Sequence, residues 1–519
     1  RGAACGAEDD AAGLLQLRGR GGGAPGEGVD ELVDELMAQI EKTLPPGGAA
    51  AGKGVDPQKL KEQMLGSVRS MVVNLIKFVL PCTREVLDAA GEFLAECRFT
   101  DWAREQIRKE VGTWGGNVTV APHVPAENFS KSTATVAWLY ATATTCPMEQ
   151  LERWPRGFDN RQCRYFAADG AAGAQVRPFQ DHQEDFSKMA DLVSSLVAKA
   201  LAKCTVVGEK WAKRWGKWAV KPLLNLLAKL FHGFVEKQFQ GNKKGFVAVD
   251  KVLGAVVVSV SGTGIPGDPG FLDDYFADAD FWWNLAGEKG AECDVGDVRL
   301  PGYYHPGFCL YYQKMLLYSS YADDLATTVR GNPGLDLLFT GHSLGGAAIT
   351  IAAIDARHRL GFEPRRWLLY TFGSPRAGSP ESAGYVNTHF DVAWRVTRKY
   401  DPVPLMVPCF PAAGIAGWSE VPAGQAACMP LERGPYHYGS EVYFPYDPYD
   451  PQPGFPPEVP EYRVCSGGGE DPACSASVPL KEFVCKAGAG DLAKLGEGFG
   501  IVHVDYMHNG LSEWCCAAA

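Results

Sequence analysis

Residues 338–350 read Leu-Phe-Thr-Gly-His-Ser-Leu-Gly-Gly-Ala-Ala-Ile-Thr. An apolar run leads into a G-x-S-x-G pentapeptide at 341–345, and a run of small residues typical of a packed helix follows. This strand–turn–helix context is that of a nucleophile elbow, whose strained serine points its hydroxyl clear of both elements. The flanking glycines remove side chains that would collide across the bend. We therefore predict that Ser343 is a nucleophile beside a helix N-terminus, where free N–H groups favour developing negative charge.

Segments on both sides of the elbow alternate between β-branched apolar runs and helical patterns. Alternation of this kind predicts an α/β fold with a mostly parallel central sheet, and with the elbow it predicts an α/β hydrolase. The expected strands are 246–249, 255–260, the run before Ser343, 367–372 and 392–396, and the expected helices are 310–330 and 344–357.

The composition is that of a soluble globular protein with more than one domain, since the chain has 519 residues, 46% of them hydrophobic and 21% charged. The net charge of −11 argues against a general nucleic-acid binder. No apolar run reaches the roughly 18 residues that span a bilayer. No zinc spacing, P-loop or dinucleotide fingerprint occurs, so we expect neither a metal nor a cofactor.

Cysteines and glycosylation sequons indicate the compartment. The chain has 15 cysteines and the sequons Asn117-Val-Thr and Asn128-Phe-Ser, which together favour an oxidising environment. We expect a secreted protein or one of the endomembrane lumen. Buried reduced cysteines with unused sequons are the alternative, and the odd count leaves at least one thiol outside any internal pair.

A serine hydroxyl needs a base, and the base needs an acid that fixes its tautomer. In α/β hydrolases the chain order is serine, acid, histidine. Asp401 is the best acid because it directly follows an expected strand, and Asp391 is held in reserve. Three histidines come later in the chain: His437, His503 and His508. His503 is our choice, although spacing alone leaves His508 open.

A basic and aromatic segment lies within 209–240. Its tryptophans share one helical face, with basic residues about a quarter turn away. One interpretation is an interfacial helix whose tryptophans lie at headgroup depth on a membrane or lipid droplet. The other is that the tryptophans pack on the protein and the lysines are solvated. The tryptophans concerned are Trp211, Trp215 and Trp218.

Several motifs resemble those of the class 3 lipases, the fungal-type triacylglycerol lipase family. The elbow resembles the family's G-H-S-L-G-G, and the other similar stretches are Thr371-Phe-Gly-Ser-Pro-Arg-Ala-Gly, Tyr400-Asp-Pro-Val-Pro, His305-Pro-Gly-Phe and His503-Val-Asp-Tyr. The last of these favours His503 over His508. The resemblance covers about 132–165 and 243–516.

The resemblance implies an oxyanion hole and a lid. Thr263 and the N–H of Leu344 would hold the oxyanion, and Ser261 stands where the family usually has arginine. Residues 265–280 would form the lid, although an ordinary surface helix is the alternative. Its apolar face would be Phe271, Leu272, Tyr275 and Phe276. The resemblance also implies a Cys465–Cys474 disulfide and another joining Cys146 to Cys515 or Cys516.

The resulting domain prediction is a Gly/Ala-rich flexible leader at 1–54, a helical extension at 55–131 and a class 3 lipase-like α/β-hydrolase domain at 132–519. A basic amphipathic helical insertion at 166–242 interrupts the last. Residues 440–480 are rich in proline and tyrosine, and we expect a surface excursion there.

The predicted activity is hydrolysis of carboxylic esters, with acylglycerols as substrates and an acyl-enzyme intermediate. Peripheral contact with a lipid surface is expected through the lid or the basic segment. Within enzymes, phospholipase A1 or feruloyl-esterase-like activity is an alternative. From another class, the chain could be a catalytically silent protein that binds lipid surfaces.

Overall fold

The computed structural model describes residues 111–146, 148–153, 175–180, 244–262, 289–361, 363–401, 403–405, 407, 409, 428–445, 461–466, 468–477, 502–503, 505–507 and 509–510, together with Ala38 and Glu62. The predicted leader, most of the helical extension, the tryptophan segment and the lid lie outside these residues.

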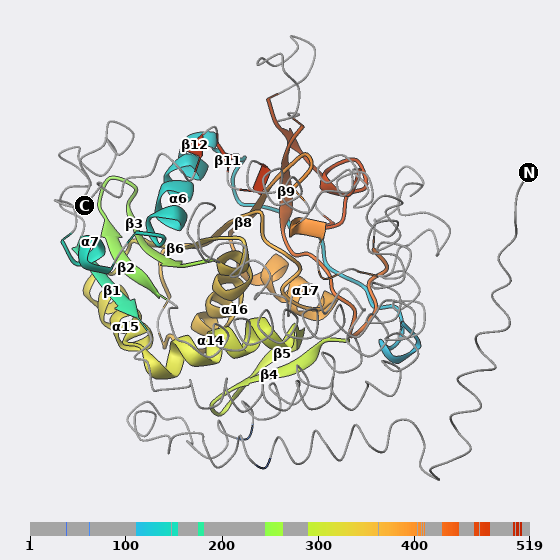
Figure 1. Ribbon diagram of the computed structural model, residues 1–519, viewed down its shortest axis with the longest axis horizontal. Coiled ribbons are helices and arrows are strands. Elements are labelled where there is room, and N and C mark those ends of the chain that lie inside the picture. Colours follow the sequence, from blue (N-terminus) through green and yellow to red (C-terminus); the bar gives the residue numbers. More distant parts are fainter. Residues whose placement is uncertain are drawn as a thin grey trace, which may run out of the picture.

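An eight-stranded sheet forms the centre of the molecule, in the order β1-β2-β3-β6-β7-β8-β9-β10 (Figure 1). Its strands from β3 to β9 are parallel, whereas β1, β2 and β10 pair antiparallel at the two edges. The strands are β1 Gln175–Gln180, β2 Lys244–Asp250, β3 Ala255–Val260, β6 Asp336–His342, β7 Trp367–Phe372, β8 Val392–Arg398, β9 Ser440–Phe444 and β10 Arg463–Val464. This mostly parallel sheet with an elbow after β6 confirms the predicted α/β-hydrolase fold.

Helices cover both faces of the sheet (Figure 1). Val256 and Val258 of β3 pack in the cluster that includes α14 to α17, whereas Val257 packs in the cluster that includes α6 and α7. Successive side chains of a strand point to opposite faces, which is why a strand apolar throughout serves two cores. The helices are α6 Lys131–Ala143, α7 Met148–Glu152, α14 Pro306–Tyr318, α15 Tyr321–Gly331, α16 Leu344–Arg359 and α17 Pro380–His389.

Smaller elements complete the described chain. A hairpin of β4 Ala291–Val295 and β5 Val298–Tyr304 precedes α14, and β11 Asp505–Tyr506 pairs with β12 Asn509–Gly510 near the end of the sequence. The 3₁₀ helices are η2 Val111–Thr113, η6 Val403–Leu405 and η7 Ser475–Ser477. None of the helices in the described part has the length and apolarity needed to cross a bilayer.

The helix expected at 310–330 is two helices, α14 and α15. The break lies at Ser319, whose hydroxyl donates to the Met315 carbonyl and accepts from the Tyr321 N–H at 3.2 Å. Such side-chain bonds compete with the helical backbone pattern and end α14 there.

Two strands lie where the sequence predicted other structure. Residues 175–180, inside the insertion predicted to be helical, form β1, and Pro178 is tolerated because β1 is the edge strand of the sheet. Residues 440–444 are not part of a surface excursion, because they form the fully buried strand β9 between β8 and β10. Both strands are short and contain polar residues, and their pairing depends on partners far along the chain.

Residues 114–130, at the end of the predicted helical extension, contain no helix and are bonded to the body of the domain. Val118 donates its N–H to the Pro430 carbonyl, and Ala126 donates to that of Asp391, each at 2.8 Å. Both sequon asparagines, Asn117 and Asn128, are exposed on this segment.

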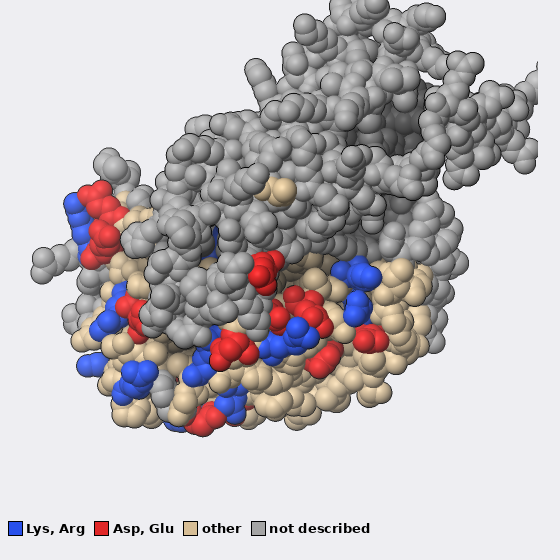
Figure 2. Space-filling model, turned by 90° about the horizontal axis from the view of Figure 1, so that it is seen from below, with Lys and Arg blue, Asp and Glu red and all other residues tan. Residues whose placement is uncertain are grey.

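Three disulfides lie within the described residues: Cys293–Cys309, Cys409–Cys428 and Cys465–Cys474. The last was implied by the family resemblance and is confirmed. Cys146 is also disulfide-bonded. On the face shown in Figure 2, basic and acidic side chains of the described residues are interspersed, with no broad area of one sign in that part.

Candidate active site

Ser343 lies between β6 and α16 with φ 57° and ψ −132°, a backbone region that few non-glycine residues adopt. Its N–H donates to the Phe372 carbonyl at 2.9 Å, which fixes the turn against β7. A Cβ on Gly341 would lie 2.4 Å from the Gly345 carbonyl oxygen, and one on Gly345 would lie 2.6 Å from that of Val260. Both glycines of the motif are therefore required by close approach, and the segment has the geometry of a nucleophile elbow.

Asp401 lies three residues beyond the end of β8, at the same edge of the sheet as the elbow. The residue before it, Tyr400, has φ 65°, which turns the chain sharply after the strand. The Val403 N–H donates to the Asp401 carboxylate at 2.9 Å, and the side chain is buried. The residue that the sequence predicted as the acid therefore lies buried beyond the carboxyl end of β8.

His503 reaches Asp401 from 102 residues further along the chain. Its Nδ1 lies 3.0 Å from both carboxylate oxygens of Asp401. Because an ionised carboxylate only accepts, the ring nitrogen donates, and this assigns the proton of the neutral ring to Nδ1. Nε2 is then the basic nitrogen, as a general base for a hydroxyl requires.

Tyr506 also donates to the Asp401 carboxylate. Burial raises the pKa of the Tyr506 phenol well above 10.0, and the nearby charge of Asp401 raises it further. The phenol therefore keeps its proton at neutral pH and donates it to the carboxylate. Asp401 accordingly accepts from an imidazole, a phenol and a backbone N–H at once.

Gly373 provides the space in which these groups meet. It follows β7 directly and has φ +54°. A Cβ there would lie 2.8 Å from Asp401 Oδ2, 2.9 Å from the Tyr506 hydroxyl and 3.0 Å from His503 Cε1. Since Ser343 is bonded to the Phe372 carbonyl, the serine, imidazole and carboxylate all adjoin the end of β7.

His342, directly before the serine, forms the second connection between the elbow and His503. Its Nε2 lies 2.9 Å from the His503 backbone carbonyl, and the two ring centroids are 4.5 Å apart. Burial lowers the pKa of His342 well below 6.5, and the nearby His503 lowers it further. A neutral His342 therefore donates this bond. Neither His342 nor Gly373 was singled out from the sequence, because both depend on contacts with a distant segment.

The remaining candidates lie elsewhere or have other partners. The reserve acid Asp391 accepts from the Trp367 N–H at 2.8 Å, at the start of β7 and thus at the opposite edge of the sheet. His437 is bonded through Nε2 to the Pro404 carbonyl at 2.7 Å. His508, Thr263 and the lid residues lie outside the described residues. Leu344 is the first residue of α16, as an oxyanion donor would be.

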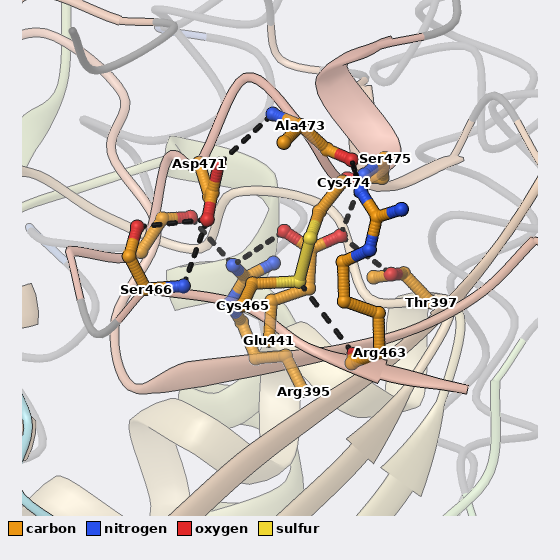
Figure 3. Close-up of a disulfide and its surroundings, with 11 residues drawn as sticks. Arg395, Thr397, Glu441, Arg463, Cys465, Ser466, Asp471, Ala473, Cys474 and Ser475 are labelled. Carbon is orange, nitrogen blue, oxygen red and sulfur yellow. Dashed lines mark hydrogen bonds and ion pairs between the residues drawn. A yellow bond between two sulfur atoms is a disulfide. The ribbon is translucent and has the colours of Figure 1, made fainter. Parts of the chain in front are cut away.

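A buried network supports the strand that leads to Asp401 (Figure 3). Glu441 of β9 accepts from the Thr397 hydroxyl of β8 at 2.5 Å and from the Ser475 N–H at 2.9 Å. Arg395 of β8 lies 3.4 Å from Glu441 and donates to the Gly469 carbonyl at 2.5 Å. The loop closed by Cys465–Cys474 is thus fastened to the carboxyl end of β8.

Two groups in the described part of the chain bring cysteine and carboxylate atoms close together. They are Cys409, Cys428 and Glu470, and Cys465, Asp471 and Cys474. Both cysteine pairs are disulfides, so they have no thiolate to offer a metal.

A serine on this turn, after a strand of a mostly parallel sheet and beside an imidazole–carboxylate pair, defines the chain as an α/β hydrolase. Residues 269–410 match the family model of the class 3 lipases. Over this region the chain is similar to the class 3 lipases.

Known proteins similar to this chain include two secreted fungal lipases. Secreted mono- and diacylglycerol lipase 1 of Fusarium solani is 38% identical over 104 residues, which are 20% of this chain and 29% of that protein. Secreted mono- and diacylglycerol lipase A of Penicillium cyclopium is 28% identical over 173 residues, 31% of this chain and 45% of that protein. The chain thus matches less than half the length of either relative.

Among solved structures, the lipase from Rhizopus microsporus var. chinensis aligns with 77% of this chain and 99% of its own, at 16% identity and a TM-score of 0.42.

Proposed function

We propose that this protein is a lipase-like carboxylic ester hydrolase that acts on acylglycerols. Ser343 is the nucleophile, His503 the general base and Asp401 the residue that orients the base. The observation that carries the proposal is the contact of His503 Nδ1 with both oxygens of Asp401, beside a serine in elbow geometry.

The reaction proceeds in two halves. His503 Nε2 takes the hydroxyl proton as Ser343 Oγ bonds to the ester carbonyl carbon, and the same proton then passes to the departing alcohol. Water, deprotonated by His503, attacks the acyl-enzyme; the bond to Ser343 Oγ then breaks, His503 returns the proton to that oxygen, and the carboxylic acid is released. The carbonyl oxygen carries negative charge in both tetrahedral intermediates, and the N–H groups of Thr263 and Leu344 hold it.

The surroundings of Asp401 suit the positive charge that forms on His503. The carboxylate is buried and accepts from Val403 and Tyr506 as well as from the imidazole. Charge-assisted bonds of this kind are short and about twice as strong as neutral ones. They hold the carboxylate in one orientation, so the imidazolium forms without rearrangement of its neighbours.

Acylglycerols are proposed because the similar fungal proteins are mono- and diacylglycerol lipases. A secreted or lumenal location is proposed from the disulfides, the exposed sequon asparagines and the secreted relatives. Contact with a membrane or lipid droplet, through the predicted lid or the tryptophan segment, belongs to the same proposal.

The test compares chromogenic esters of rising acyl length on the wild type and on Ser343→Ala. We expect turnover of aliphatic esters that the variant loses, and covalent labelling by a fluorophosphonate on the peptide that carries Ser343. Release of the sn-1 acyl group from phospholipids in preference to acylglycerols would assign a phospholipase A1, and a preference for feruloyl esters would assign a feruloyl esterase. Liposome binding without Ser343-dependent turnover would show a catalytically silent protein.

A further inference from the structure

The chain just beyond Asp401 makes a tight turn that buried charged groups hold in place. The Asp401 carboxylate accepts from the Val403 N–H at 2.9 Å, and Val403 begins the 3₁₀ helix η6. Val407, close behind η6, has φ 53°, a strained value for a β-branched residue. Strained positions of this kind persist only where the surrounding structure fixes them. The groups that fix this turn therefore also bear on the position of Asp401.

Arg376 supplies two of the contacts that hold the turn. It lies between β7 and α17 and is buried. Its Nη1 donates to the Leu405 carbonyl at 3.0 Å and to the Val407 carbonyl at 3.3 Å. Its Nε and Nη2 donate to the two carboxylate oxygens of Glu470, at 2.8 Å and 2.9 Å. The guanidinium is thus oriented by a bidentate bond on one side and binds the turn on the other.

Glu470 reaches the same turn by a second route. Its buried carboxylate accepts from the His437 N–H at 3.0 Å. The His437 ring bonds in turn through Nε2 to the carbonyl of Pro404, inside η6, at 2.7 Å. Glu470 lies in the loop that the Cys465–Cys474 disulfide closes. This loop therefore orients both of the side chains that bind the turn.

We infer that the buried Glu470–Arg376 pair positions Asp401 for the proposed reaction. The inference rests on the proposed function, because it concerns how the acid is held against the base. Both residues act through η6 rather than on the reacting atoms. The Val403 N–H bonds Oδ1 of Asp401, and His503 Nδ1 bonds the same oxygen at 3.0 Å. A shift of η6 would therefore change how the carboxylate meets the imidazole.

The competing interpretation is that the pair only stabilises the fold, since a buried carboxylate needs partners wherever it lies. Asp355 of α16 offers a matched control. This buried carboxylate also pairs with an arginine, Arg359, at 2.6 Å. It lies near the end of α16 that is far from Ser343. Glu470→Gln and Asp355→Asn each remove one buried carboxylate beside an arginine and keep the shape of the side chain.

The experiment uses the full-length wild type, Glu470→Gln and Asp355→Asn on one soluble ester. It measures KM, Tm, the pH profile of kcat/KM, and kcat per active site. Active sites are counted by fluorophosphonate titration, so that an unfolded fraction does not lower the value.

We expect Glu470→Gln to lower kcat per site about tenfold with KM unchanged, less than the roughly 10²-fold cost of a 1 Å misplacement. The acidic limb of its pH profile reports protonation of the base. This limb should move to lower pH, because a carboxylate held close to an imidazole favours the protonated ring. Asp355→Asn should keep the wild-type kcat per site and the wild-type limb, whatever its Tm.

Arg376→Lys carries the test if Glu470→Gln does not fold. Lysine keeps a positive charge beside Glu470, but it cannot bind two carboxylate oxygens and two carbonyls at once. This variant should also lower kcat per site and move the acidic limb to lower pH.

Wild-type kcat per site in these variants would overturn the role of the pair, and so would a lower kcat with the acidic limb unmoved. An equal loss in Asp355→Asn would overturn it as well, because any buried carboxylate would then have the same effect. A wild type that lacks Ser343-dependent turnover would overturn the proposed function together with this inference.

Discussion

His342 donates a hydrogen bond from Nε2 to the backbone carbonyl of His503, across 2.9 Å and 161 residues of sequence. Because Ser343 follows His342 directly, this bond ties the proposed nucleophile to the segment that carries the proposed base. Trp138 packs edge-on against the His342 ring, with centroids 5.2 Å apart, and helps to hold it in place. A neutral His342 would also avoid repelling the imidazolium that His503 becomes in the proposed reaction.

Replacing His342 with phenylalanine should therefore impair the proposed reaction. The ring would still pack on Trp138, but the buried His503 carbonyl would lose its donor, which typically costs about 1–3 kcal/mol. We expect kcat to fall about tenfold or more, since small displacements of a base slow proton transfer strongly. Steady-state kinetics with thermal unfolding measures both effects. His342→Gln retains a donor and should recover part of kcat, whereas a fully active phenylalanine variant would contradict the role of this bond.

His437 predicts how stability depends on pH. Burial, followed by the charges of Arg395 and Arg376, lowers the pKa of His437 well below 6.5. The unfolded chain therefore binds a proton near pH 6.5 that the folded protein does not, and stability must fall as the pH drops below that value. One such group contributes at most about 1.4 kcal/mol per pH unit.

The contribution of His437 is the difference in unfolding free energy between the wild type and a variant without this histidine, measured at each pH. His437→Gln should show a shallower loss of unfolding free energy between about pH 6.5 and 4.5 than the wild type, because its carboxylates titrate alike in both. Denaturant unfolding at several pH values measures the slopes. Parallel wild-type and His437→Gln curves would rule out the buried neutral state of His437.

The parts of the fold that the sequence predicted correctly are those with a local pattern. The run at 367–372 is apolar throughout and coincides with β7, and the elbow at 341–345 carries its own glycines. Strand β9 has no such pattern, because it begins Ser440-Glu441 and its burial depends on Thr397, Arg395 and Ser475. A buried carboxylate is acceptable only with such partners, and no local pattern indicates them.

The candidate site also contains residues that a local sequence pattern predicts and residues that no such pattern indicates. Asp401 and His503 could be predicted from the sequence because each occurs in a motif of its own. In the structure the two side chains meet beside the Ser343 elbow. The contact of His342 with His503 joins segments that no periodicity connects, so it emerges only from the folded arrangement.

Tyr506 should contribute to both activity and stability. Tyr506→Phe removes a donor to a buried carboxylate, and hydrogen bonds to charged groups contribute about 1.5–3 kcal/mol. We expect a lower Tm and a several-fold lower kcat. Tyr370→Phe is the matched control, because the buried Tyr370 hydroxyl has no hydrogen-bond partner among the described residues. Its loss should leave Tm unchanged or raise it, and equal Tm values for the two variants would show that the Tyr506 bond contributes nothing.

Gly373→Ala should abolish most activity, because it places a methyl group where Asp401, Tyr506 and His503 meet. The added Cβ would lie within 3.0 Å of Asp401, Tyr506 and His503, at a φ of +54° that alanine rarely adopts. Any relief requires the carboxylate or the imidazole to move, and a misplacement of about 1 Å can cost about 10²-fold in rate. Gly384→Ala is the control, since no atom lies within 4 Å of its added Cβ inside α17. That change should raise the unfolding free energy by about 0.5–1 kcal/mol. Kinetics and denaturant unfolding of both variants measure these effects. A Gly373→Ala protein with wild-type kcat would show that the His503–Asp401 pair tolerates the added methyl group. Close packing at the end of β7 would then not be what positions the base.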